Sequence, residues 1–213
     1  MSSRKIIGLS IVGAFVLGAG FLVSRAGLSP QPHKDASTQT AVAEATLIKG
    51  TGAVSIGGPF LLEDHTGRTR SHLDFRGKYS LVYFGYTYCP DICPTALYGL
   101  TDALERMGDK AKNFQPLFIT VDPKRDTVQV LNGYLKHFHP SLIALTGTPE
   151  AIAKAMSAYH VHAAIPPSET GKADYIMDHS SLIYVMDQRG RFVASFNHAT
   201  PSEHMARVLL TLS

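Results

Sequence analysis

The chain has 213 residues, with 20 lysines and arginines against 17 aspartates and glutamates, which gives a formal net charge of +3 at pH 7. So small a charge, without a long basic run, argues against a nucleic-acid-binding protein. The length allows one domain of ordinary size plus additional segments. The chain has only two cysteines, and their spacing, Cys89-x-x-x-Cys93, is consistent with a disulfide, a redox pair or half of a metal site.

The N-terminus predicts a membrane anchor. Residues 6–23 carry no charged side chain and follow Arg4 and Lys5. Such a run approaches the roughly 20 residues that a helix needs to cross a bilayer, and it exceeds the about 7–15 residues of a signal-peptide core. We therefore predict an uncleaved transmembrane helix over 6–23, with residues 1–5 in the cytoplasm. Cleavage near residues 24–26 is the alternative.

The two segments after the anchor differ in composition. Residues 24–51 are rich in Ser, Thr, Gln, Ala and Pro and show little apolar periodicity, which predicts a flexible tether. Residues 52–213 are predicted to form one globular domain. The chain lacks a long Arg-rich presequence, which favours the inner membrane of a bacterium, with the domain in the periplasm, over a mitochondrion.

Short apolar runs bounded by turn residues predict the strands of this domain. These strands cover residues 59–64, 79–84, 116–121, 142–145, 181–186 and 192–196, and the first enters a hairpin turn at 66–68. Apolar residues at helical spacing predict helices between them: one from Pro94 to Gly108, one capped by Asp126, one beginning at Thr148-Pro149, and a last one with a capping box at 200–203.

The order of these elements predicts the fold class. Strands alternate with helices, and the chain ends in a hairpin followed by a helix, which indicates an α/β sandwich with a mixed sheet. With two cysteines at the first strand–helix junction, this arrangement is similar to the thioredoxin fold. The hairpin that precedes the cysteine strand is then an N-terminal β-hairpin extension.

The cysteines lie where sulfur chemistry is favoured. They follow the strand 79–84 and come just before the helix that we expect to begin at Pro94. A helix N-terminus has free N–H groups and a partial positive charge, so it favours a thiolate, which is both a nucleophile and a soft metal ligand. A structural zinc site would need further ligands at recognisable spacing, and a second C-x-x-C pair is missing. An inert structural disulfide would close only a small loop and stabilise little.

Three segments together resemble the Sco/SenC family of membrane-anchored copper proteins. They read G-Y-T-Y-C-P-D-I-C-P at 85–94, T-V-D-P-K-R-D-T at 120–127 and D-Y-I-M-D-H-S at 174–180. The resemblance runs from about residue 58 to the C-terminus, and the predicted anchor and tether also fit it. It implies a thioredoxin-like domain that binds copper, as Cu(I) or Cu(II), through Cys89, Cys93 and His179.

The resemblance also implies a function. Family members assist assembly of the binuclear copper site in cytochrome c oxidase subunit II, by delivering copper, by reducing the cysteines of that site, or both. The expected partners are subunit II, a copper donor protein and the membrane. Two thiolates and one imidazole suit Cu(I), which prefers soft ligands. His179 precedes a strand that we expect beside the cysteine strand, and Asp178 could orient its ring.

The sequence suggests three candidate functions. The first is a copper metallochaperone, a binding protein without turnover, which the sequence favours. The second is a dedicated thiol–disulfide oxidoreductase with Cys89 and Cys93 as a redox-active disulfide. Thioredoxin-type enzymes have a shorter cysteine spacing and a cis-proline before the later strand, where this chain has Met177-Asp178-His179. The third, a peroxidase, is rejected because Tyr86 occupies the place of the required threonine.

Overall fold

The computed structural model describes residues 55–212. The strands of this part are β1 (Leu61–Asp64), β2 (Thr69–Ser71), β3 (Tyr79–Gly85), β4 (Phe114–Thr120), β5 (Ile143–Thr146), β6 (Ala163–Ala164), β7 (Asp178–His179), β8 (Leu182–Met186) and β9 (Phe192–Asn197). The helices are α1 (Ile92–Met107), α2 (Val128–Leu135), α3 (Pro149–Ala158) and α4 (Ser202–Leu210), with short 3-10 turns at His72–Phe75, Gly108–Asn113 and Pro167–Glu169.

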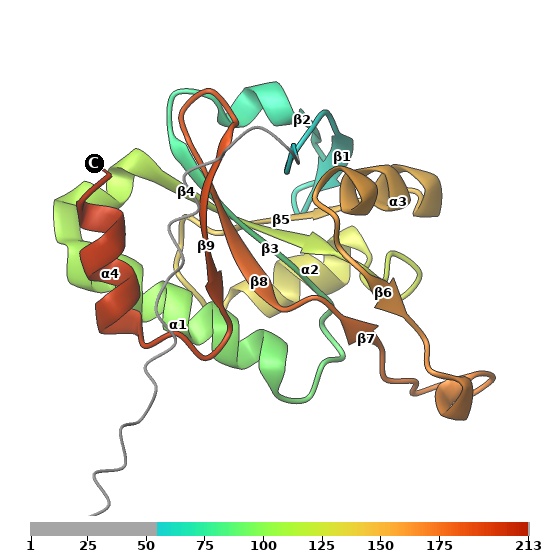
Figure 1. Ribbon diagram of the computed structural model, residues 1–213. Helices are drawn as coiled ribbons and strands as arrows, with labels where there is room; N and C mark the ends of the chain where they lie inside the picture. The colour runs from blue at the N-terminus through green and yellow to red at the C-terminus, as the bar shows by residue number, and fades with distance from the viewer. Residues whose placement is uncertain (1–54, 213) are drawn as a thin grey trace, which may run out of the picture. The chain divides into compact units, whose positions relative to one another are not determined.

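The predicted mixed sheet is confirmed. Seven strands form one sheet in the order β2-β1-β5-β4-β3-β8-β9 (Figure 1). The three inner strands β3, β4 and β5 run parallel, and β1 and β8 join them antiparallel on either side. The predicted N-terminal hairpin is the β1–β2 pair, which extends the sheet beyond β5.

Strand β3 lies at the centre of the core. It pairs with β4 along its whole length, from Tyr79↔Phe114 to Gly85↔Thr120, and with β8 on its other edge. Every residue after the first is buried. Such burial on both faces is typical of a strand with aromatic and β-branched residues in a parallel sheet, and it fixes the position of the loop that follows.

Neighbouring residues of β3 point to opposite faces of the sheet. The ring of Tyr83 packs on Phe118 of β4, and Phe118 packs on Tyr134 of α2. The ring of Phe84 packs instead on Tyr159 at the end of α3. Helix α2 therefore covers the Tyr83 face and α3 the Phe84 face, while α1 and α4 pack against each other (Figure 1).

Three predicted helix starts are corrected. Helix α1 begins at Ile92 rather than Pro94, so Cys93 lies inside its first turn. Thr127, not Asp126, caps α2, because its hydroxyl accepts the amide of Val130. The predicted capping box at α4 is absent: the N-cap residue is Pro201, which has no side-chain acceptor.

One element was not predicted. Strands β6 and β7, of two residues each, form a separate antiparallel ribbon outside the main sheet. Two residues are too short to show a strand period in the sequence. The predicted anchor at 6–23 and tether at 24–51 lie outside the described residues. Within residues 55–212, no helix is both long and apolar enough to span a membrane.

Candidate metal centre

The loop that carries the first cysteine is fastened to the sheet. Its residue Thr87 donates to the Asp126 carboxylate through both its amide, at 3.0 Å, and its hydroxyl, at 2.6 Å. Asp126 is fully buried and also accepts the hydroxyl of Thr120, at the end of β4. Burial raises the pKa of Asp126, which these hydrogen bonds oppose. The buried carboxylate thus ties the loop after β3 to the end of β4.

Cys89 takes the place of a helix cap. The N-cap residue of α1, Asp91, makes no side-chain capping bond. The amide of Cys93 in the first helical turn donates instead to the Cys89 sulfur, at 3.4 Å. An unsatisfied helical amide is a donor to negative charge, so this contact stabilises the thiolate of Cys89.

Cys93 packs against the last residue of β3. Its side chain is 0% exposed. A Cβ atom on Gly85 would lie 2.9 Å from the Cys93 sulfur and 3.0 Å from side-chain atoms of Phe118 and Tyr83. Only glycine leaves room for the sulfur to approach the strand so closely.

His179 reaches the cysteines from the β6–β7 ribbon, where it pairs with Ala163. Its Nε2 lies 3.2 Å from the Cys93 sulfur, and its Nδ1 lies 3.0 Å from the carbonyl oxygen of Ser180. A carbonyl oxygen can only accept, so Nδ1 carries the proton and Nε2 presents its lone pair to the cysteines. The Ser180 carbonyl therefore orients the ring, and the expectation that Asp178 does so is wrong.

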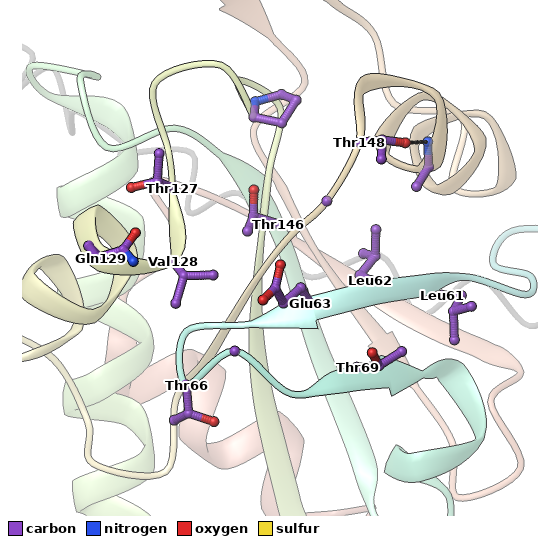
Figure 2. Close-up of a pocket in the computed structure, with 14 residues that line it drawn as sticks. Leu61, Leu62, Glu63, Thr66, Thr69, Thr127, Val128, Gln129, Thr146 and Thr148 are labelled. Atoms are coloured by element: carbon purple, nitrogen blue, oxygen red, sulfur yellow. Dashed lines mark hydrogen bonds between the residues drawn. The ribbon is translucent and has the colours of Figure 1, made fainter.

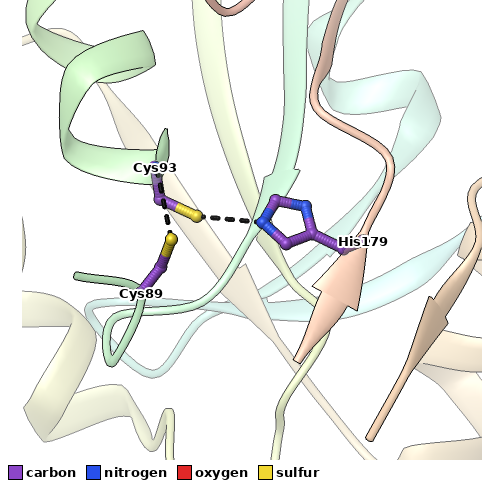
Figure 3. A group of neighbouring side chains, drawn as sticks. All are labelled: Cys89, Cys93 and His179. Carbon is purple, nitrogen blue, oxygen red and sulfur yellow. Dashed lines mark hydrogen bonds between the residues drawn. The ribbon is translucent and has the colours of Figure 1, made fainter. Parts of the chain in front are cut away.

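The structure brings all three predicted site residues together. The two sulfurs and the ring nitrogen of Cys89, Cys93 and His179 lie within 4.8 Å of one another (Figure 3). The rings of Tyr86 and Tyr83 stand edge-on to the imidazole, with centroids 5.6 Å and 6.3 Å away. Both cysteines are in the reduced form, outside any disulfide. The group is therefore two sulfurs and one nitrogen in a mostly aromatic surrounding.

The two thiols differ in their electrostatics. Hydrogen bonding from Cys93 lowers the pKa of Cys89 to about 3, against the effect of burial. The sulfur of Cys89, together with burial, raises the pKa of Cys93 far above its ordinary value. The pair consequently holds one thiolate, on Cys89, and one thiol, on Cys93.

Two cavities lie near this end of the sheet. A cavity of about 310 Å³ opens beside Cys89 and His179, with Pro90, Ile92 and Ile176 among its walls. A larger one, of about 830 Å³, lies between β1 and the starts of α2 and α3 (Figure 2). The described residues that line it include no cysteine or histidine, and the threonines at the two helix starts already cap those helices. The smaller cavity is the one that gives access to Cys89 and His179.

Several contacts around the site were not predicted from the sequence. The hydroxyl of Tyr86 accepts the amide of Met177 at 3.0 Å, which ties the cysteine loop to the strand of His179. Asp122 accepts hydrogen bonds from Arg125 and from the hydroxyl of Tyr175. These residues belong to the three segments that carry the family resemblance, and the polar groups of Tyr86 and Asp122 shortly after β3 and β4 were the available signal.

Comparison with known proteins gives consistent results. A family model described as SCO1/SenC matches residues 48–213. The mitochondrial protein SCO1 of Saccharomyces cerevisiae is 44% identical over 151 residues, which are 70% of this chain and 51% of that protein. The chain thus spans about half the length of this yeast relative. A SCO2-like protein of Rickettsia prowazekii is 38% identical over 90% of each chain.

Solved structures are also similar. The copper-bound structure of ScoI from Bradyrhizobium japonicum is 43% identical, with a TM-score of 0.69 over 75% of this chain and 100% of that one. The copper-bound structure of yeast Sco1 is 39% identical, with a TM-score of 0.69 over 74% of this chain and 88% of that one. The fold and the family resemblance predicted from the sequence are both confirmed.

Proposed function

Because this chain belongs to the SCO1/SenC family, we propose that it is a copper metallochaperone that assists assembly of the binuclear copper site of cytochrome c oxidase subunit II. Its ligands to copper are Cys89, Cys93 and His179. The observation that carries the proposal is the convergence of their three donor atoms within 4.8 Å. Copper-bound relatives support the choice of metal.

The donor set fits copper. Two sulfurs and one imidazole nitrogen are soft and borderline ligands, which favour Cu(I) and tolerate Cu(II). The proton on Nδ1 of His179 leaves Nε2 free to coordinate. A structural zinc site would hold four ligands, and the group of described residues supplies three. A three-coordinate site can release its metal to a partner that offers further ligands.

The two sulfurs have unequal access. Cys93 is fully buried, whereas Cys89 is half-buried and borders the 310 Å³ cavity. An incoming ligand from a partner can therefore reach a metal ion on the side of Cys89, while Cys93 and His179 still hold it. Copper would be transferred by stepwise ligand exchange, in which the Cys89 bond is the first to be replaced.

The location and partners are part of the same proposal. We expect the anchor at 6–23 to hold the chain in a bacterial inner membrane, with the domain in the periplasm. The partners in that compartment are a copper donor protein and subunit II of the oxidase. The copper-binding domain would then lie on the side of the membrane where the oxidase receives its copper.

A second function is favoured by the low pKa of Cys89. A thiolate near neutral pH can attack a disulfide of a partner protein and form a mixed disulfide. Cys93 would then attack the Cys89 sulfur, so that the partner leaves as a dithiol and Cys89–Cys93 becomes a disulfide. The buried, protonated state of Cys93 slows this second step. We therefore place a dedicated thiol–disulfide oxidoreductase second.

The two functions are separated by His179→Ala. Two thiolates can hold Cu(I) in a linear geometry, whereas Cu(II) prefers more ligands with nitrogen among them. We expect the purified variant to retain measurable Cu(I) binding and to lose its Cu(II) complex. Cells that carry it should lack copper-loaded oxidase if the chain delivers copper, and should keep most oxidase activity if it reduces cysteines.

The controls use other side chains of the same chain. His137→Ala changes an exposed histidine and should leave both copper states unaffected. Cys93→Ser removes one of the two sulfur ligands and should abolish tight binding of either state. A normal copper content of the oxidase in His179→Ala cells would contradict the chaperone function. Tight copper binding by the oxidised, disulfide form would contradict the two-thiolate site.

A further inference from the structure

His179 lies on a part of the domain that makes few hydrogen bonds to the rest of the domain. Its strand β7 has two residues and, within the described part of the chain, pairs only with β6, outside the main sheet. Residues 165–177, which we call the histidine arm, connect these two strands. In residues 55–212, the hydrogen bonds from the arm to the rest of the domain all involve Tyr175 and Met177.

Arg125, in the loop between β4 and α2, contacts the arm with its guanidinium group. Its Nη1 donates to the backbone carbonyl of Tyr175 at 2.9 Å, and its Cζ lies 3.6 Å from the centre of the Tyr175 ring. Its Nε donates to Asp122 at 2.5 Å. The Tyr175 hydroxyl completes the cycle by donating to the same carboxylate at 2.8 Å.

The same guanidinium also faces the cysteine loop. Its Cζ lies 4.7 Å from the ring centre of Tyr88 and 5.7 Å from that of Tyr86. Tyr88 directly precedes Cys89 in the chain, and Tyr86 lies in the same loop just before it. The Arg125 side chain is only 15% exposed. A partly desolvated cation over aromatic rings is attracted more strongly than an exposed one.

The chemistry of these contacts requires arginine. A planar guanidinium can donate in its plane to a carboxylate and a carbonyl while its faces pack on aromatic rings. A lysine at this position would keep the positive charge and lose both the fork of donors and the stacking. The contacts of Arg125 therefore join three segments that are distant in sequence: the cysteine loop, the loop after β4 and the histidine arm.

We propose that Arg125 is a positioning residue for His179: with Asp122 and Tyr175 it clamps the histidine arm so that Nε2 stays beside the two sulfurs. The consequence for copper rests on the proposed function, because it concerns the metal that His179 would bind. The clamp itself does not, since it joins protein groups only. Without it, the ribbon can move away from the cysteines while the main sheet stays intact.

The test compares Arg125→Lys with the native chain, first without metal. Hydrogen exchange of the amides of residues 176–180 should become faster by about tenfold or more, because the arm opens more often. The amides of β3 should keep their native rates. Tyr175→Phe, which removes only the hydroxyl bond to Asp122, should give a smaller change in the same amides.

The second readout is copper affinity. Arg125→Lys should weaken Cu(II) binding by roughly 10- to 100-fold and alter the Cu(II) absorption spectrum, because the imidazole is held less well. Cu(I) binding by the two sulfurs should change little. In the His179→Ala background, Arg125→Lys should cause no further loss of Cu(II) affinity, since the residue through which it acts is gone.

The matched control is Arg191→Lys, the same change at another Arg–Asp pair, with Asp187 at the β8–β9 turn. It should leave both readouts at their native values. Unchanged exchange in the arm of Arg125→Lys would overturn the clamp. A loosened arm with an unchanged Cu(II) complex would overturn its role in positioning His179. If the native chain binds no copper, the proposed function fails, and the exchange data still decide on the clamp.

Discussion

Cys89 and Cys93 are four residues apart and yet have opposite environments. Cys89 borders a cavity and accepts an amide of the first turn of α1, whereas Cys93 is fully buried against β3. The helix amide and the neighbouring thiol both favour charge on Cys89. One sulfur is thus prepared as an accessible thiolate, and the other is held as a protonated, fixed partner of His179.

This asymmetry predicts the titration of the reduced, metal-free chain. The pKa of Cys89 is lowered to about 3, and that of Cys93 is raised. One thiolate per molecule should therefore persist as the pH falls from neutral and should disappear only near pH 3, as followed by thiolate absorbance. Because folding lowers the pKa of Cys89, its stabilising contribution is complete above the unfolded value near 9.0 and declines as the pH falls toward about 3.

The control for this titration is Cys93→Ser. It removes the thiol that contributes most to the shift, so the midpoint of Cys89 should move upward, toward its ordinary value. His137→Ala should leave the midpoint where it is. Loss of the thiolate signal of the native chain at pH 8 to 9 would contradict the arrangement of the two sulfurs.

At the scale of elements, the site depends on the contact between β3 and α1. The strand ends at Gly85, and the first turn of the helix brings Cys93 directly over it. A Cβ atom at Gly85 would meet the Cys93 sulfur at 2.9 Å and two aromatic side chains at 3.0 Å. The helix can rest this close to the strand only because residue 85 has no side chain.

Gly85→Ala should therefore destabilise the domain. Forcing one methyl group into a closely packed site costs about 1–3 kcal/mol, which urea denaturation of the reduced chain can measure. Gly99→Ala is the matched control, because Gly99 lies within α1 and a Cβ there would meet nothing within 4 Å. That change should stabilise the helix by about 0.5–1 kcal/mol. Equal effects of the two substitutions would contradict the close approach at Gly85.

The same elements show what the sequence could and could not predict. The spacing of apolar residues and the turn residues are local signals in the sequence. They predict strand β3, the helix that contains Cys93 and the β8–β9 hairpin. The role of Asp126 could not be predicted in this way. A carboxylate just before a helix looks like a helix cap in the sequence. Its actual partners are Thr87, which is far away in the sequence, and Thr120, on the other side of a turn. The strands of the β6–β7 ribbon are too short to show an alternating strand pattern in the sequence.

At the scale of the whole molecule, the site joins distant parts of the chain. Cys93 and His179 are 86 positions apart and meet because β8 pairs with β3. The position of His179 was predicted from this neighbourhood, together with the family resemblance. The contacts of Arg125 that hold the ribbon were not predicted, because aromatic and charged side chains in loops show no regular spacing in the sequence. The site is therefore a property of the folded sheet.

The described domain has a buried core of its own, from Phe60 to Leu209. We therefore predict that a chain without residues 1–51 folds, stays soluble and binds copper with unchanged affinity. Thermal unfolding and copper titration of the shortened chain can check this. In cells, the shortened chain should fail to support oxidase assembly, because it is no longer held at the membrane. An unrelated single-pass anchor fused before residue 52 should restore assembly. Failure of that fusion, with copper binding intact, would show that residues 1–51 do more than hold the domain in place.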